Sequence, residues 1–139
     1  MTTADFIKKT FNTTSTRERR CSSVFTDQDG NVYSYGYHYP LLFKLGGITF
    51  VNTNGYSNTT GRHILWARQA EPNAIPVKLK GNRLSTLTLY KIYTLLAGEI
   101  AEVVEQMSSK KRKDTAVYAD LGRQLEILKA NYATVESKL

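Results

Sequence analysis

Apolar residues recur every three or four positions through the C-terminal part of the chain, the repeat expected of helices that bury one face. The first such helix is predicted to run from Ser85, its N-cap, to Met107. The second begins at Asp114, its predicted N-cap, and keeps a heptad-like alternation of apolar residues as far as Leu139. We therefore expect an antiparallel helical hairpin over residues 83–139, which either packs on the rest of the chain or pairs with a second copy.

The N-terminal part alternates apolar and polar residues in short runs separated by turn signals, the pattern of β-hairpins. An Asp-Gly turn separates Ser22–Thr26 from Asn31–Tyr35, and a Gly-Gly turn separates Leu41–Leu45 from Ile48–Val51. Glycine suits such turns because it adopts positive φ without steric cost. These four runs predict a four-stranded antiparallel meander.

Two helices and a fifth strand complete the predicted N-terminal part. Ala4–Phe11 is expected to form a short helix, and Thr59 or Thr60 to cap a helix that ends near Ala70. Ile75–Lys80 is expected to form the further strand. The predicted fold class is α+β, with a small antiparallel sheet of four to five strands over residues 1–82, followed by the hairpin in one domain of 139 residues.

Composition restricts the range of functions. The chain contains 41% hydrophobic and 22% charged residues, no apolar run long enough to span a membrane and no apolar signal-peptide core near residue 1, so we expect a cytoplasmic protein. The single cysteine, Cys21, excludes an internal disulfide and a cysteine-based metal cluster. Phosphate-binding and dinucleotide-binding glycine motifs are absent, as is a nucleophile elbow. We predict no cofactor and no metal.

The charge of the chain indicates the class of partner. The net charge is +7 and the pI about 9.5. Residues 1–80 carry 10 basic and 5 acidic side chains, whereas residues 81–139 carry 9 and 7. A basic excess favours nucleic acid or a host nucleoprotein as the partner, through neutralisation of phosphates. The alternative is that the charge serves solubility alone.

Tyrosines accompany this basic excess. If residues 33–39 continued as a strand, Tyr33, Tyr35, Tyr37 and Tyr39 would project from one side, because alternate residues of a strand share a face. Four aligned rings form either a core wall or a platform on which bases stack. The predicted binding residues are Arg19, Arg20, Tyr35, Tyr37, Tyr39, Tyr56, Ser57, Thr59, Thr60, Arg62 and Arg68.

The two histidines offer one catalytic alternative. Metal-independent RNA cleavage needs a base, an acid and a cation near one phosphate, and histidine titrates near neutrality. His38 and His63 would supply the proton transfers and Arg62 the cation. The competing interpretation is that His38 ends a strand and His63 packs in its helix, so the sequence leaves open whether the protein is an enzyme and favours a binding protein.

Two segments, Tyr35–Leu41 and Asn54–His63, together resemble the signature of a family of small uncharacterised proteins encoded by bacteriophages and prophages. The shared pattern is Tyr-Gly-x-His-Tyr-Pro followed by Gly-Tyr-Ser-x-Thr-Thr-x-x-His. The resemblance implies a viral setting in host cytoplasm and no particular activity. It also adds a third hypothesis, an inhibitor of a host defence system of the anti-CRISPR kind that binds a protein. The residues it marks are Tyr35, His38, Pro40, Tyr56, Ser57, Thr59, Thr60 and His63.

Overall fold

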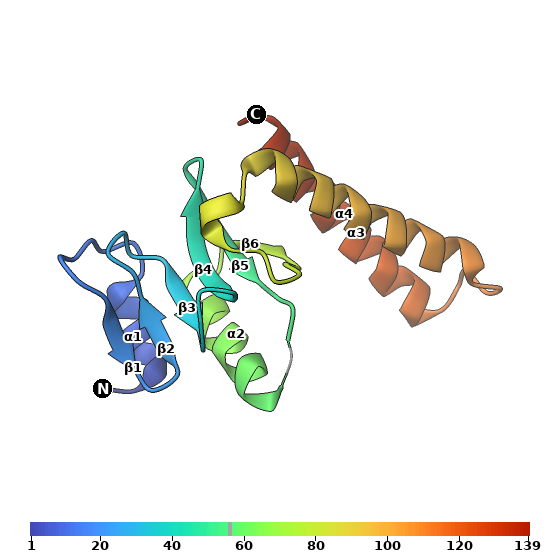
Figure 1. Ribbon diagram of the computed structural model, residues 1–139. Coiled ribbons are helices and arrows are strands. Elements are labelled where there is room, and N and C mark those ends of the chain that lie inside the picture. Colours follow the sequence, from blue (N-terminus) through green and yellow to red (C-terminus); the bar gives the residue numbers. More distant parts are fainter. Residues whose placement is uncertain (56) are drawn as a thin grey trace. The chain divides into compact units, whose positions relative to one another are not determined.

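The computed structural model describes residues 1–55 and 57–139, which form two compact units, Met1–Thr88 and Leu89–Leu139 (Figure 1). The first unit holds a six-stranded sheet with two α-helices, and the second unit is a pair of helices. The predicted α+β class and C-terminal helix pair are confirmed, with six strands instead of four or five. The boundary between the units follows Thr88, whereas the sequence placed the start of the helical part at residue 83.

The strands lie in the sheet in the order in which they occur in the chain. Neighbouring strands are antiparallel from β1 to β5, and both predicted hairpins, β2–β3 and β4–β5, are present. The strands are β1 (Arg19–Cys21), β2 (Val24–Thr26), β3 (Val32–Ser34), β4 (Pro40–Leu45), β5 (Ile48–Asn52) and β6 (Ile75–Val77).

Two features of the sheet differ from the prediction. The sequence did not predict β1, because its residues Arg19, Arg20 and Cys21 show no apolar alternation, and backbone pairing with β2 forms this strand instead. The last strand, β6, pairs parallel to β5, so the sheet is mixed and not wholly antiparallel. A helix lies between these two strands in the sequence, and such a crossover connection makes a parallel pair possible.

The two helices of the first unit, α1 (Thr3–Thr10) and α2 (Asn58–Ala70), pack on one side of the sheet. We call this side the helix-covered face. The N-cap of α2 is Ser57, whose hydroxyl accepts a hydrogen bond from Thr60 N at 3.2 Å, so the predicted caps Thr59 and Thr60 lie inside the helix. The core on this face is formed by Phe6, Ile7, Phe11, Val24, Val32, Leu42, Val51 and Ala67.

The opposite side of the sheet is lined by rings, and we call it the aromatic face. Phe25 pairs with Tyr33 across β2 and β3, and Phe43 pairs with Phe50 across β4 and β5. Alternate residues of a strand point to opposite faces. These four side chains therefore point away from the helix-covered face, where Val24 and Val32 lie. The pairs stack with ring centroids 5.1 and 5.6 Å apart, respectively.

A short 3₁₀ helix, η1 (Leu84–Thr86), occupies the place where the first hairpin helix was predicted to begin, so Ser85 does not cap that helix. The second unit then comprises α3 (Leu89–Ser109) and α4 (Ala116–Glu136), which run antiparallel. None of the helices within the described ranges combines the length and apolar character needed to cross a bilayer.

Side-chain contacts join the two helices at one end of the second unit and tie the connecting loop to α3 at the other. Tyr93 stacks on Tyr132 at 4.2 Å between centroids, and its hydroxyl donates to a carboxylate oxygen of Glu136 at 2.6 Å. At the other end, Lys113 Nζ donates to Met107 O at 2.8 Å.

The N-cap of α4 differs by one residue from the prediction. Thr115 caps the helix, because its hydroxyl accepts from Tyr118 N at 3.2 Å. Asp114, the predicted cap, forms an ion pair with Arg112 instead.

Glycines at two turns provide a test of the fold. Gly30 and Gly47 both have positive φ, 89° and 78°. A Cβ at Gly30 would lie 2.8 Å from Asn12 N and 2.5 Å from Thr13 N, whereas one at Gly47 would meet nothing within 4 Å.

We expect Gly47→Ala to lower the free energy of unfolding by about 1 to 2 kcal/mol, because alanine is disfavoured at positive φ. Gly30→Ala should lower it further, because its Cβ would also clash with the backbone of Asn12 and Thr13. Denaturant unfolding of both variants measures this difference, and equal losses would contradict the contact between the β2–β3 turn and the loop after α1.

Candidate functional site

The segment Tyr35–Tyr39 does not continue strand β3, and the predicted row of four tyrosines is therefore wrong. The strand ends at Ser34, Tyr35 has a φ of 68°, and the chain turns back so that Tyr39 N donates to Gly36 O at 3.1 Å. Ser34 N then donates to Tyr39 O at 3.1 Å and closes the turn. Positive φ at a non-glycine residue breaks the alternation on which the prediction rested.

This turn separates the four tyrosines. Tyr33 and Tyr39 are buried, with exposed fractions of 4% and 2%, whereas Tyr35 and Tyr37 are exposed at 56% and 43%. The hydroxyl of Tyr39 donates to Asn54 O at 2.6 Å, which ties the ring into the core. Tyr33 and Tyr39 therefore expose much less ring surface than Tyr35 and Tyr37 do.

The two exposed rings lie on opposite sides of the sheet. Tyr35 lies 5.9 Å from the ring of His63, which belongs to α2 and so to the helix-covered face. Tyr37 packs edge-on against the aromatic face, 5.0 Å from Phe25 and 4.9 Å from Tyr33. A single platform made of both exposed rings is thus not formed, and each must be considered with its own neighbours.

Two carboxylates hold the tyrosine hydroxyls of the aromatic face. Tyr37 donates to Glu18 Oε1 at 2.7 Å, and Tyr33 donates to Asp27 Oδ2 at 2.8 Å. The hydrogen bond to Glu18 is the main cause that raises the pKa of Tyr37, and burial is the main cause that raises the pKa of Tyr33. Both phenols stay protonated at neutral pH, and their ring positions are fixed.

Cationic side chains flank Tyr37. The guanidinium of Arg20 lies over the Phe25 ring, 4.7 Å from its centroid, which is a cation–π distance. Arg83 is exposed and lies in the segment that faces the tyrosines. We call Arg20, Tyr37 and Arg83, with the rings of Phe25 and Tyr33 behind them, the Tyr37 surface.

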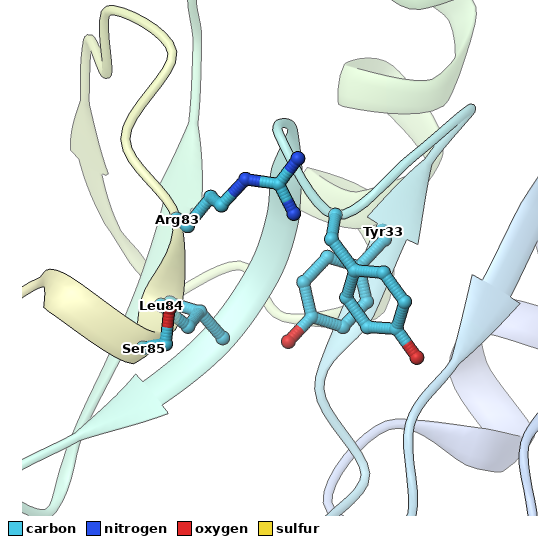
Figure 2. Close-up of a pocket in the computed structure, with 5 residues that line it drawn as sticks. Tyr33, Arg83, Leu84 and Ser85 are labelled. Atoms are coloured by element: carbon cyan, nitrogen blue, oxygen red, sulfur yellow. The ribbon is translucent and has the colours of Figure 1, made fainter.

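A pocket of about 250 Å³ opens in this surface. One wall consists of Tyr33 and Tyr37, and the other of residues Arg83–Ser85, so all of the lining belongs to the first unit. Figure 2 shows the Arg83 side chain extending from its segment toward the tyrosine wall. Sequence reasoning missed this second wall, because these residues were assigned to the start of the helical hairpin, with Ser85 as its N-cap.

The two histidines occupy different environments. His63 is buried, with Nδ1 2.7 Å from Ser34 Oγ and Nε2 3.5 Å from Ser23 Oγ, and burial lowers its pKa. His38 is exposed, and its ring lies against Gly36, where a Cβ would meet Nδ1 at 2.7 Å. The cleavage scheme considered from the sequence uses both imidazoles at one phosphate. In the structure His38 is exposed, whereas His63 is buried and bonded to hydroxyls.

The remaining predicted residues fall into two groups. Arg19 is half-buried and structural, since its guanidinium donates to Thr13 O and, at 3.4 Å, to Asp27 O. Thr60 is buried in α2, and Tyr56 lies outside the described residues. The other predicted residues of the helix side are exposed or half-exposed around α2, namely Ser57, Thr59, Arg62 and Arg68.

The basic excess belongs almost entirely to the first unit. Residues 1–88 contain 11 basic and 5 acidic side chains, a net charge of +6, and residues 89–139 contain 8 and 7, a net charge of +1. Within the described residues, no cluster of three or more His, Cys, Asp or Glu side chains is placed to hold a metal ion. The unit that carries the Tyr37 surface therefore carries nearly all of the net positive charge.

Comparisons with known proteins do not assign a family: no protein-family model matches the chain, and no curated protein or solved structure is significantly similar to it. The resemblance of its two segments to a phage family stays a hypothesis.

The environment of His63 predicts a pH dependence of stability. Because burial lowers its pKa in the folded state, the unfolded state takes up the proton first as the pH falls below about 6.5. The stabilisation is complete above that pH and is lost below it, by at most about 1.4 kcal/mol per pH unit. We expect His63→Gln to flatten this dependence between pH 7 and pH 5. Unfolding curves of both proteins across this range measure the difference, and parallel curves would contradict the prediction.

Proposed function

We propose that this protein is a nucleic-acid-binding accessory protein, in a phage setting, whose first unit binds single-stranded nucleic acid or a nucleoprotein that carries it. The observation that supports this best is the exposed ring of Tyr37 between Arg20 and Arg83, in a unit of net charge +6. An exposed aromatic ring beside arginines is the arrangement on which unpaired bases stack while the backbone phosphates are neutralised.

Pre-organisation of the ring supports the proposal. Tyr37 is fixed by edge-on contacts with two buried rings and by the hydrogen bond from its hydroxyl to Glu18. A side chain that is already ordered loses little conformational entropy when a ligand stacks on it. Its exposed fraction of 43% leaves part of the ring accessible to a base.

Charge placement favours a single strand in one orientation. Glu18 and Asp27 accept hydrogen bonds from the tyrosine hydroxyls, so anionic phosphates are repelled from that end of the rings. Arg20 and Arg83 attract phosphates on the flanks. Base faces are free for stacking only where the strand is unpaired, which favours single strands over a duplex.

The two exposed tyrosines provide a matched pair of variants. We expect Tyr37→Ala to weaken binding of fluorescent single-stranded RNA and DNA homopolymers by about 5- to 150-fold, the loss of one stacked base, and Tyr37→Phe to retain most of the affinity. Tyr35→Ala, which removes the more exposed ring on the opposite side of the sheet, should bind as the wild type does. Fluorescence anisotropy measures the affinities. Equal losses in Tyr35→Ala and Tyr37→Ala, or no binding at low salt by the wild type, would overturn the proposal.

The salt dependence tests the arginines separately. We expect Arg20→Ala to reduce the slope of log affinity against log salt by about 0.7, the contribution of one phosphate contact to a single strand. Arg123→Ala is the control, because Arg123 is exposed in the second unit and pairs with Asp120. The slope should not change in that control, and a reduction of similar size in both variants would indicate general charge attraction without a defined surface.

A further inference from the structure

We infer that the pocket of the Tyr37 surface holds one unpaired nucleobase, with the adjoining phosphate at Arg83. This inference rests on the proposed function and adds to it a base-selective position. Stacking on the outside of Tyr37 alone is tolerant of sequence, whereas enclosure of a base brings its edge within reach of polar groups.

The size of the pocket matches a small ligand. Its volume of about 250 Å³ lies below the range of about 300–1,000 Å³ that is typical of sites for drug-sized molecules. A single planar heterocycle is the part of a nucleic acid that fits between two such walls. The exposed ring of Tyr37 is the main apolar surface of one wall, beside the largely buried Tyr33, and Leu84 provides apolar surface on the other wall.

The distribution of charge orients the ligand. The carboxylates that bind the tyrosine hydroxyls, Glu18 and Asp27, place negative charge at the hydroxyl end of the tyrosine wall, so a phosphate there is unfavourable. The opposite wall carries the exposed guanidinium of Arg83, which suits a phosphate because it donates several hydrogen bonds in one plane. The neutral base therefore lies against the tyrosines and the phosphate on the arginine wall.

Selectivity follows from the few polar groups that remain to read the edge of the base. Each tyrosine hydroxyl already uses its proton in a hydrogen bond to a carboxylate, so neither donates to a ligand. Ser85 lines the pocket, and a serine hydroxyl can both donate and accept a hydrogen bond. We expect this serine and the adjoining backbone to distinguish among bases at one position of the bound strand.

A pocket-filling variant tests the inference. Ser85→Phe places a ring in the cavity, whereas Thr86→Phe adds the same ring at the next position, which is exposed and does not line the pocket. Binding of the four nucleoside monophosphates, followed by NMR chemical shifts, should show about fivefold or greater differences among bases in the wild type and in Thr86→Phe. Ser85→Phe should lose this discrimination and bind each monophosphate at least about tenfold more weakly. Circular dichroism confirms that both variants are folded.

Oligonucleotides separate failure of the pocket from failure of the proposed function. If wild type and Ser85→Phe bind homopolymers equally and rank the monophosphates identically, the base pocket is wrong while surface binding stands. If the wild type binds neither homopolymers nor monophosphates, the proposed function fails and the pocket fails with it. Wild type should bind a nucleoside monophosphate more tightly than the nucleoside. Arg83→Lys should retain this preference, because lysine keeps a cation for the phosphate, and Arg83→Ala should lose it.

Discussion

The hydrogen bond between Ser34 and His63 is the constraint on which the arrangement of the first unit depends. Both side chains are buried, and their polar atoms lie 2.7 Å apart. A buried hydroxyl or imidazole without a partner costs about 1 to 3 kcal/mol, so each side chain requires the other. The bond joins the last residue of β3 to the middle of α2, and thereby fixes where the strand ends and where the helix lies on the sheet.

Because β3 ends at that contact, the following residues turn and divide between the two faces of the sheet. Tyr35 lies beside His63 on the helix-covered face, and Tyr37 lies on the aromatic face beside Tyr33. The polar and aromatic residues that are adjacent in the sequence thus contribute to two different surfaces. One accessible ring, two arginines and a pocket occur together on one of these surfaces, the Tyr37 surface.

The elements with strong periodicity were predictable, and the elements that depend on tertiary pairing were not. The hairpin helices, the two β-hairpins and α2 follow from local patterns of apolar residues and turn glycines. By contrast, β1 has no apolar alternation, and the parallel direction of β6 depends on the path of the chain around α2. Of the candidate site, the sequence identified Arg20 and Tyr37. The sequence did not identify Arg83. This residue lines the same pocket as Tyr37 but lies 46 positions later in the chain, and no local sequence pattern indicates such a contact.

The tyrosine row shows the same limit at a single residue. Side chains alternate between the two faces of a strand only while the backbone stays extended. Tyr35 has a positive φ, so the alternation stops there. Glycine or asparagine would have signalled such a turn, but a tyrosine at this position does not. The buried contact directly before this turn joins Ser34 to His63, two residues that are 29 positions apart in the sequence.

The parallel pairing of β6 with β5 has a consequence for synthesis of the protein. Until the ribosome has released Val77, strand β5 has no neighbour on that side, and its backbone groups form an open edge next to the rings of Phe43 and Phe50. Unpaired strand edges beside exposed apolar surface are the regions through which nascent chains associate wrongly. The chain therefore exposes this edge of the sheet to incorrect association until β6 pairs with β5.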